Sequence, residues 1–222
     1  MACVKICGIT NLDDARAAAE AGADLLGFVF HPPSPRYLPP AQAGEIVARL
    51  RAMPETAAVR CVGVFVDRCA EHICEVASRC GLDAVQLHGD ESAQLVAALM
   101  ARGLDVIKAV RVRGAASLSA LAAYRASAYL LDTYVAGQPG GTGRAFDWAL
   151  AARAREYGRI ILAGGLTPEN VAHALRAAHP WGVDVSSGVE AAPGRKDYER
   201  LRRFVAAAKG AILSADTVAG CG

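Results

Sequence analysis

The sequence has no stretch of about 20 uninterrupted apolar residues, the length that a helix needs to cross a bilayer, so no membrane-spanning segment is expected. Its first residues, MACVKICGIT, lack a basic start followed by a long apolar run, and no secretory signal is expected there. No basic stripe alternates with aromatic residues and the net charge is only +2, which argues against a nucleic-acid partner. What the 222 residues do have is a hydrophobic fraction of 53%, enough for a sizeable core.

The seven cysteines do not suggest a disulfide framework, because their number is odd. Such a set suits a reducing cytoplasm, where we expect the protein to reside. Cys69, His72, Cys74 and Cys80 lie close together in the sequence, but they contain no C-x-x-C pair and fall across a probable helix. We therefore expect these side chains to pack a helix and not to bind a metal ion.

Eight short apolar runs rich in β-branched residues recur along the chain. Their lengths suit buried strands, and they do not alternate strictly with polar residues, as expected for parallel strands covered on both faces. Eight strand–helix units in 222 residues give about 28 residues per unit, close to the minimum for a (β/α)8 barrel. The runs are VKICGI, LLGFVF, CVGVFV, AVQLHG, VIKAVRV, AYLLDTY, RIILAGG and GVDVSS.

A doubly wound open sheet is the competing α/β arrangement. It usually has fewer strands and often carries G-x-G-x-x-G after its first strand, whereas the first run here leads into CGITNL. The glycine-rich stretch GQPGGTGR lacks GK[ST] and is not a P-loop. We therefore predict an α/β protein with a single (β/α)8 TIM barrel over residues 1–209, followed by a loosely attached tail over residues 210–222.

Alanine-rich amphipathic stretches between the runs predict helices, for example LDDARAAAEAGA, AQAGEIVARLRAM and PENVAHALRAAH. Thr10 followed by Asp13 resembles a capping box, and Gly22 stands where the first of these helices would end. Thr167 and Pro168 suggest the N-cap and the first position of a later helix.

Polar and reactive side chains gather at the ends of the predicted strands, where barrel enzymes place their active sites. Cys7 ends the first strand and Arg36 follows the second. His88 ends the fourth strand, Asp132 ends the sixth, and Asp184 lies on the eighth. These side chains are therefore expected to meet on one face of the barrel.

Two glycine-rich turns follow the seventh and eighth predicted strands. Glycine lets the backbone approach a ligand closely, and successive N–H groups near a helix start attract anions. Barrels often hold a phosphate at these two loops. The alternative is that the glycines only make tight turns, but their occurrence at both positions favours phosphate binding by Gly164, Gly165, Ser187 and Gly188.

From residue 4 to about residue 205 the sequence resembles the phosphoribosylanthranilate isomerases of tryptophan biosynthesis. The matching motifs occur in the right order, one for each strand–helix unit, so the set is far more specific than any single motif. They are KICGIT, GADLLGFVFHPPSPR, VGVFVD, VQLHGDE, LLDT, GGTGRAFDW, LAGGLTPENV and VDVSSGVE.

The resemblance implies an Amadori rearrangement that needs neither a cofactor nor a metal. In this reaction N-(5′-phosphoribosyl)anthranilate, a small phosphorylated substrate, becomes a ring-opened aminoketose. A general acid protonates the furanose ring oxygen, and a general base then removes the proton from C2′. In the family an aspartic acid and a cysteine take these roles, and they correspond to Asp132 and Cys7.

Both residues suit these roles chemically. A thiol has an unperturbed pKa of about 8.5, close enough to neutral to accept a proton after a modest depression. Lys5 lies about 6–7 Å from Cys7 along the same strand and favours the thiolate, unless a carboxylate neutralises it. Asp132 has to be held partly protonated by burial or by a neighbouring carboxylate. Asp184 is either that neighbour or a residue that orients the sugar.

The resemblance also places Arg36 against the anthranilate carboxylate, where a guanidinium offers a bidentate fork and nearby prolines stiffen the loop. His88 is either a substrate contact or a satisfied residue at the barrel rim. Loop 135–144 is either a mobile lid or, through Gly141 and its neighbours, part of the phosphate site. Family members occur as monomers and as dimers, so this chain is expected to be a monomer or a homodimer.

Other functions remain as alternatives. A Schiff-base aldolase needs a lysine at the site, for which Lys108 on the fifth strand is the only other barrel-strand candidate. A phosphate-binding barrel without catalysis predicts a damaged acid or base, whereas Cys7 and Asp132 are both present. A histidine-pathway aminoaldose isomerase performs a related rearrangement, but such barrels usually use paired aspartates, and residue 7 is a cysteine.

Overall fold

The computed structural model describes residues 1–112, 114, 116–132 and 148–216. Eight parallel strands form a closed barrel in which each strand pairs with its neighbours in sequence order, and β8 pairs with β1. The prediction of a barrel over an open sheet is thus confirmed, and each predicted run overlaps one strand. The strands are β1 (Cys3–Cys7), β2 (Leu25–Val29), β3 (Arg60–Phe65), β4 (Ala84–Leu87), β5 (Asp105–Arg111), β6 (Ala128–Asp132), β7 (Ile160–Ala163) and β8 (Gly182–Val185).

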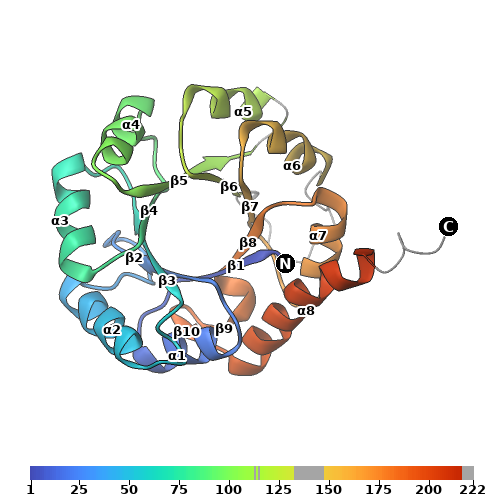
Figure 1. Ribbon diagram of the computed structural model, residues 1–222, viewed down its shortest axis with the longest axis horizontal. Coiled ribbons are helices and arrows are strands. Elements are labelled where there is room, and N and C mark those ends of the chain that lie inside the picture. Colours follow the sequence, from blue (N-terminus) through green and yellow to red (C-terminus); the bar gives the residue numbers. More distant parts are fainter. Residues whose placement is uncertain (113, 115, 133–147, 217–222) are drawn as a thin grey trace.

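Helices surround the barrel on its outside (Figure 1). The longest, α8, runs past residue 209 to Asp216, so the expected boundary between barrel and tail falls inside a helix. None of the described helices is long and apolar enough to cross a membrane. The helices are α1 (Leu12–Glu20), α2 (Pro40–Ala52), α3 (Ala70–Cys80), α4 (Ala93–Ala101), α5 (Ala116–Ser119), α6 (Trp148–Ala154), α7 (Val171–Ala178) and α8 (Tyr198–Asp216).

Shorter elements complete the connections. After β8 the chain makes a short 3-10 helix and then a small antiparallel pair of strands, β9 and β10, which lies beside the barrel. The remaining elements are η1 (Ala120–Ala123), η2 (Arg155–Tyr157), η3 (Ser187–Val189), β9 (Glu190–Ala192) and β10 (Arg195–Lys196).

The predicted capping box at the start of α1 is wrong. The N-cap is Asn11, whose Oδ1 accepts a hydrogen bond from the backbone N–H of Asp14 at 2.8 Å. The hydroxyl of Thr10 instead donates to the carbonyl of Gly194 at 2.5 Å, which ties the start of α1 to the β9–β10 turn. The end of α1 is as predicted, since Gly22 follows directly after the C-cap residue.

The predicted start of α7 is also wrong, because the helix begins at Val171 with Asn170 at its N-cap. Thr167 and Pro168 open a turn that precedes the helix. In that turn the Thr167 carbonyl accepts a hydrogen bond from Val171 N–H at 3.1 Å, and the Asn170 side chain accepts one from Thr167 N–H at 2.8 Å. The two residues thus mark where the chain turns, but the helix starts after them.

The lower interior of the barrel is filled with aliphatic side chains from alternate positions of the strands, as the two-residue period of a strand requires. This packing leaves room for polar chemistry only toward the carboxyl ends of the strands. The members of this interior cluster are Leu25, Val62, Ala84, Ile107, Ala109, Ala128, Leu130, Ile161 and Ala163.

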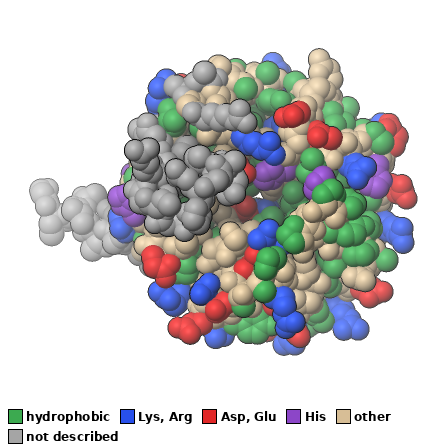
Figure 2. Space-filling model, turned by 180° about the vertical axis from the view of Figure 1, so that it is seen from behind, with side chains coloured by type: hydrophobic (Ala, Val, Ile, Leu, Met, Phe, Trp, Pro, Cys, Tyr) green, Lys and Arg blue, Asp and Glu red, His purple; other side chains and the backbone are tan. Residues whose placement is uncertain are grey.

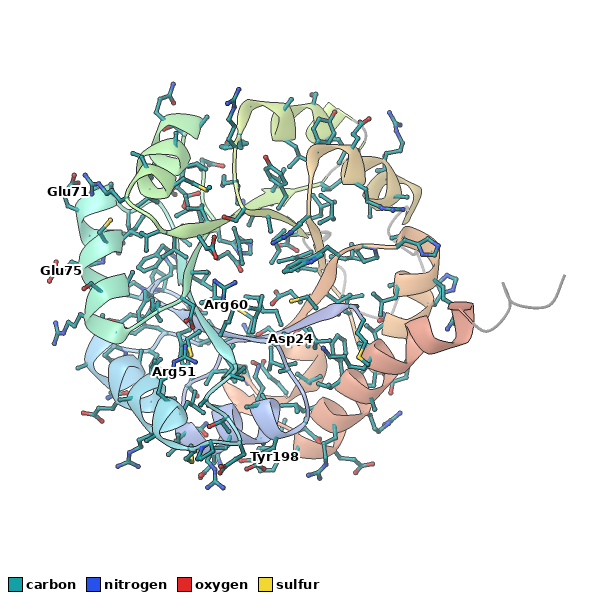
Figure 3. All side chains as sticks on the ribbon, viewed as in Figure 1. Asp24, Arg51, Arg60, Glu71, Glu75 and Tyr198 are labelled. Atoms are coloured by element: carbon teal, nitrogen blue, oxygen red, sulfur yellow. The ribbon has the colours of Figure 1, made fainter. Side chains whose placement is uncertain are left out.

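The amino-terminal ends of the strands carry ion pairs. Arg60 Nη2 contacts Asp105 Oδ2 at 2.6 Å, and Arg51 pairs with Asp83. Asp24, Arg51 and Arg60 lie on the face turned toward the viewer in Figure 3. These contacts link α2 with the starts of β3, β4 and β5, so this end of the barrel is a structural one.

Candidate active site

A pocket of about 560 Å³ opens at the carboxyl ends of the strands. Figure 2 looks onto this face and shows a hollow with histidine, basic and acidic side chains around it. The pocket brings together nearly all the side chains that the sequence singled out. Those that line it are Cys7, Arg36, His88, Asp132, Gly164, Gly165, Asp184, Ser187 and Gly188. Gly141 and loop 135–144 lie outside the described residues.

The thiol of Cys7 belongs to a buried ionic group at the floor of the pocket. Lys5 Nζ lies 2.7 Å from Asp184 Oδ1, and the Lys5 side chain is fully buried. The same ammonium interacts with the Cys7 thiol. Asp184 therefore pairs with Lys5, which is the alternative in which a carboxylate neutralises the lysine.

Gly27 on β2 makes room for this group, and the sequence analysis did not single it out. Gly27 pairs with Cys7 across the two strands. A Cβ atom on residue 27 would stand 2.8 Å from Cys7 Sγ and 3.0 Å from Lys5 Nζ, closer than side chains approach each other. The lack of a side chain at this position is what lets the thiol and the ammonium occupy one space.

Burial dominates the protonation of Cys7. Desolvation raises the pKa of the Cys7 thiol, the charge of Lys5 lowers it, and the charge of Asp184 raises it again, for a net increase. The modest depression of the thiol pKa expected from the sequence is therefore not found. Burial lowers the pKa of Lys5, but Asp184 and then Cys7 raise it by more, so Lys5 stays charged.

Asp132 at the end of β6 lies at one end of a short chain of polar side chains. Its Oδ2 is 3.3 Å from Nε2 of His88, and Nδ1 of His88 is 2.8 Å from the amide nitrogen of Gln86. His88 therefore contacts the predicted acid directly, which the sequence could not show. Gln86 lies two residues before His88 on the same face of β4, was not predicted, and lines the pocket as well.

Arg36 is held by a partner that the sequence analysis did not assign. Its Nε and Nη2 contact the two carboxylate oxygens of Glu190 at 2.8 and 2.6 Å. Among the described residues, Nη1 of Arg36 makes no hydrogen bond. Burial raises the pKa of Glu190, but the hydrogen bond from Arg36 and the charge of Lys196 lower it by more. Arg36 is thus fixed in direction at the pocket edge with one nitrogen still available.

Lys196 on β10 supports this pair from behind. Its Nζ contacts Glu190 at 3.0 Å and the Cys7 carbonyl at 2.6 Å. The β9–β10 hairpin thereby connects the Arg36 loop with the end of β1. A signal was present in the sequence, since Glu190 ends the motif VDVSSGVE, but nothing in its spacing indicates that it reaches Arg36.

The two glycine-rich turns after β7 and β8 lie against each other. A Cβ on Gly188 would stand 1.9 Å from the carbonyl oxygen of Leu166, so only glycine allows this approach. Gly164 and Gly165 line the pocket from the β7 side, and Ser187 and Gly188 line it from the β8 side. The turns thus present backbone to one common space.

Lys108 does not line this pocket. Ile107 and Ala109 belong to the interior cluster, so alternation along β5 turns Lys108 outward, toward the helices. Its Nζ contacts Glu91 Oε2 at 2.8 Å and the Gly89 carbonyl at 2.8 Å. A lysine that faces away from the pocket cannot form an imine with a substrate there, which removes the basis of the aldolase alternative.

The cysteines of α3 pack only in part as predicted. Cys80 is buried and Cys74 packs against the core, whereas Cys69 is exposed at the N-cap of the helix. His72 makes an edge contact with the Phe65 ring. Within the described part of the chain, no three His, Cys, Asp or Glu side chains come together in a way that could hold a metal ion.

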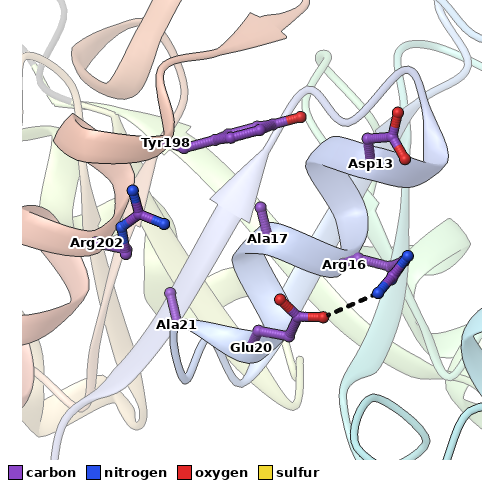
Figure 4. A pocket seen from close by; sticks show the side chains of 7 residues that line it. All are labelled: Asp13, Arg16, Ala17, Glu20, Ala21, Tyr198 and Arg202. Atoms are coloured by element: carbon purple, nitrogen blue, oxygen red, sulfur yellow. Dashed lines mark hydrogen bonds and ion pairs between the residues drawn. The ribbon is translucent and has the colours of Figure 1, made fainter.

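Another cavity lies on the surface between α1 and α8, on the outside of the barrel (Figure 4). It is lined by short alanine side chains and by charged ones, of which Arg16 and Glu20 pair with each other at 3.4 Å. None of the predicted site residues lies there. The chemistry is concentrated in the pocket at the carboxyl ends of the strands.

Comparisons with known proteins agree with this geometry. A family model described as N-(5′-phosphoribosyl)anthranilate (PRA) isomerase matches residues 4–207. An N-(5′-phosphoribosyl)anthranilate isomerase of Geobacter metallireducens is 52% identical over 206 residues, which cover 93% of this chain and 98% of that protein.

Two solved structures of such isomerases are also similar. One shows monomers generated from the dimeric enzyme of Thermotoga maritima, with a TM-score of 0.82, 45% identity, and coverage of 95% of this chain and 100% of that one. The other is a complex with reduced 1-(o-carboxyphenylamino)-1-deoxyribulose 5-phosphate, with a TM-score of 0.82, 43% identity and the same coverage. The chain therefore belongs to the N-(5′-phosphoribosyl)anthranilate isomerase family of tryptophan biosynthesis.

Proposed function

We propose that this chain performs the Amadori rearrangement of its family with Asp132 as the general acid and Cys7 as the general base. The observation that carries the proposal is that β1 and β6 bring a thiol and a carboxylate to one pocket, beside two turns of exposed backbone. General acid–base catalysis needs an acid and a base that both reach the substrate atoms that gain and lose protons.

In the first step Asp132 gives its proton to the furanose ring oxygen. The bond between that oxygen and C1′ breaks, and the nitrogen lone pair forms an iminium with C1′. The acid needs a proton at the start of this step. His88 Nε2 lies within hydrogen-bond distance of Asp132 Oδ2, so it can share a proton with this acid.

In the second step the Cys7 thiolate removes the proton from C2′. The electrons of the C–H bond form a C1′–C2′ double bond and neutralise the iminium, giving an enolamine that tautomerises to the ketone. The iminium makes the C2′ proton more acidic, and its positive charge favours the thiolate in the same way that Lys5 does. This compensates for the burial that raises the pKa of Cys7.

The remaining residues hold the substrate. Arg36 binds the anthranilate carboxylate through the nitrogen that Glu190 leaves available. Gly164, Gly165, Ser187 and Gly188 bind the phosphate with backbone N–H groups. That a relative of this chain binds a reduced carboxyphenylamino-deoxyribulose phosphate supports these assignments. Asp184 holds Lys5 in place below the sugar.

The assembly and location of the protein follow as further parts of the proposal. We infer a cytoplasmic enzyme that is a monomer or a homodimer, because a relative is described as dimeric and yields monomers. Sedimentation at micromolar concentration distinguishes the two states.

The proposal is tested by turnover of phosphoribosylanthranilate, generated in solution and followed by the loss of its fluorescence. We expect the wild type to be active in the presence of a metal chelator and Asp132→Asn to lose at least about 100-fold in kcat. Asp105→Asn, at the other end of the barrel, is the control and is expected to retain activity. A folded wild type without turnover would refute the proposal, and an active Asp132→Asn would refute the role of Asp132.

A further inference from the structure

The side-chain amide of Gln86 is buried, but only one of its two polar atoms has a hydrogen-bond partner in the described part of the chain. Its side chain is 1% exposed on β4, and its nitrogen lies 2.8 Å from Nδ1 of His88. Its oxygen is buried and has no hydrogen-bond partner among the described residues. A buried polar atom without a partner is rare in proteins and calls for an explanation.

The direction of this amide decides which nitrogen of His88 carries the ring proton. An amide nitrogen can only donate, so Nδ1 of His88 must accept and its ring proton must lie on Nε2. Nε2–H then points at Asp132 Oδ2, 3.3 Å away, and donates to it. In this arrangement Oδ2 of Asp132 accepts a hydrogen bond, so this oxygen does not carry the proton that an acid has to give.

A half-turn of the amide about its last side-chain bond reverses the direction of the hydrogen bonds that run from Gln86 through His88 to Asp132. The oxygen of Gln86 then accepts a hydrogen bond from Nδ1–H, so Nδ1 is protonated. The space between Nε2 of His88 and Oδ2 of Asp132 now holds one proton taken up from solvent, which the two atoms share. Because each orientation leaves one amide atom without a partner, the two orientations are closely matched in cost.

We propose that Gln86 is a positioning residue for the acid: when its amide oxygen faces His88, the His88–Asp132 pair holds the proton that opens the sugar ring. This inference rests on the proposed function, because it assigns that proton to the ring oxygen. The pair gives up one proton in ring opening. The Cys7 thiolate gains one from C2′. After the enolamine has become the ketone, with C1′ protonated and the C2′ hydroxyl deprotonated, the pair regains a proton from solvent and Cys7 releases one, so protons balance over the turnover.

Other charged groups face the pair from the neighbouring strands, and their charges stay in place when the amide turns. On the pocket side these are Cys7, His31, Arg36 and Asp184. On the other side His88 borders a second cavity of about 410 Å³, whose ionisable residues are Asp90, Lys108, Arg111 and Tyr124. A substitution of Gln86 therefore leaves the charges of these surrounding groups in place, and Gln86→Glu adds only its own carboxylate beside Nδ1.

Two substitutions of similar size separate the possibilities. Gln86→Glu offers only acceptor oxygens to His88 and is expected to hold Nδ1–H permanently. Gln86→Met offers neither donor nor acceptor. Gln42→Glu, an exposed residue on α2, makes the same chemical change away from the site and serves as the control.

The first readout is the long-range ¹H–¹⁵N spectrum of the His88 ring, assigned by its loss in His88→Asn. In the wild type at high pH we expect Nδ1 to be unprotonated and Nε2 to be protonated. In Gln86→Glu, Nδ1 is expected to be protonated at the same pH. In Gln86→Met we expect a mixture of the two tautomers. A change in packing alone would not exchange the two nitrogens.

The second readout is the pH dependence of kcat/KM. The basic limb is expected to move upward by about one pH unit or more in Gln86→Glu, because the pair keeps its proton to higher pH. In Gln86→Met kcat is expected to fall at least about tenfold with little change in KM. Gln42→Glu is expected to match the wild type in both readouts.

The outcomes separate this inference from the proposed function. If the wild type is active but the spectrum and pH profile of Gln86→Glu match those of the wild type, the role of Gln86 is refuted. If Gln86→Glu does not fold, Gln86→Met decides, and a wild-type kcat with one unchanged tautomer refutes it. A wild type that does not turn over phosphoribosylanthranilate refutes the proposed function and with it the use of this proton.

Discussion

Lysines on two strands of the barrel, β1 and β5, form buried pairs with carboxylates in nearly the same geometry. Lys5 lies 2.7 Å from Asp184, and Lys108 lies 2.8 Å from Glu91, with lysine side chains that are 0% and 3% exposed. What differs is the rest of the environment. Lys5 faces into the barrel and interacts with a thiol at the pocket floor, whereas Lys108 faces the helices.

The pair on β5 makes its other hydrogen bonds with backbone groups. Besides Glu91, Lys108 Nζ contacts the carbonyls of Gly89 at 2.8 Å and Ala109 at 3.0 Å. Glu91 in turn accepts hydrogen bonds from the N–H groups of Gly89 and Asp67. The hydrogen bonds of this pair therefore hold the loops after β3 and β4 in place.

In the pair on β1, the lysine also interacts with a group that can react, the Cys7 thiol. A charged lysine beside a thiol changes the stability of the thiolate, so this pair acts on a chemical group and not only on the fold. Burial and ion pairing therefore do not identify a functional lysine by themselves. The decisive feature is whether the remaining contacts go to backbone or to a titratable group in a pocket.

The largest effect on stability is expected from Lys108→Met. The substitution leaves the Glu91 carboxylate buried without its partner, and breaking a buried pair in this way costs about 3–5 kcal/mol of unfolding free energy. Urea unfolding measures it. Activity per folded molecule is expected to change far less than in Lys5→Met. The comparison fails if Lys108→Met is as stable as the wild type.

The largest effect on catalysis within this comparison is expected from Lys5→Met. Without the lysine the charge of Asp184 opposes the thiolate, so the pKa of Cys7 rises further and kcat falls by about 100-fold or more. The alkylation rate of Cys7 at fixed pH, followed by mass spectrometry, is expected to fall in parallel. An unchanged alkylation rate would show that Lys5 is only structural, like Lys108.

A smaller effect is expected from Gly27→Ala, which tests whether the close approach of lysine and thiol matters. The new methyl group would meet Cys7 Sγ and Lys5 Nζ, and overpacking of this kind costs about 1–3 kcal/mol. Activity is expected to fall as the thiol is displaced. Gly44→Ala on α2 is the matched control, because its Cβ would meet only ordinary contacts at 3.5 Å, and a wild-type Gly27→Ala would contradict the account.

The fold could be predicted because it depends on local patterns. Eight apolar runs of strand length, spaced by amphipathic stretches, leave few arrangements other than a barrel, and each run overlaps a strand. The helix starts at Thr10 and Thr167 were wrong for the opposite reason. Asn11 caps α1 with its side chain, and the hydroxyl of Thr10 donates to Gly194, which is 184 residues away. At the other site the helix begins after Asn170, whose side chain makes no capping hydrogen bond.

The site was predictable in its reactive groups but not in their partners. Cys7, His88 and Asp132 stand at strand ends, where the architecture brings side chains together. The partner of Arg36, Glu190, comes from a hairpin 154 residues away. Gln86 lies only two residues before His88, but that the amide and the ring contact each other depends on side-chain directions. No spacing in the sequence encodes these directions, so the electrostatics of the thiol and the acid had to come from the structure.

The most direct test of the account is the isomerase activity of Cys7→Ser compared with Cys3→Ser. Both cysteines belong to β1, but Cys3 lies at the amino end of the strand, away from the pocket. We predict that folded Cys7→Ser loses at least about 100-fold in kcat for phosphoribosylanthranilate, because a serine hydroxyl is a far weaker base, while Cys3→Ser stays near the wild type. Full activity in Cys7→Ser would contradict the assignment of the thiol as the base.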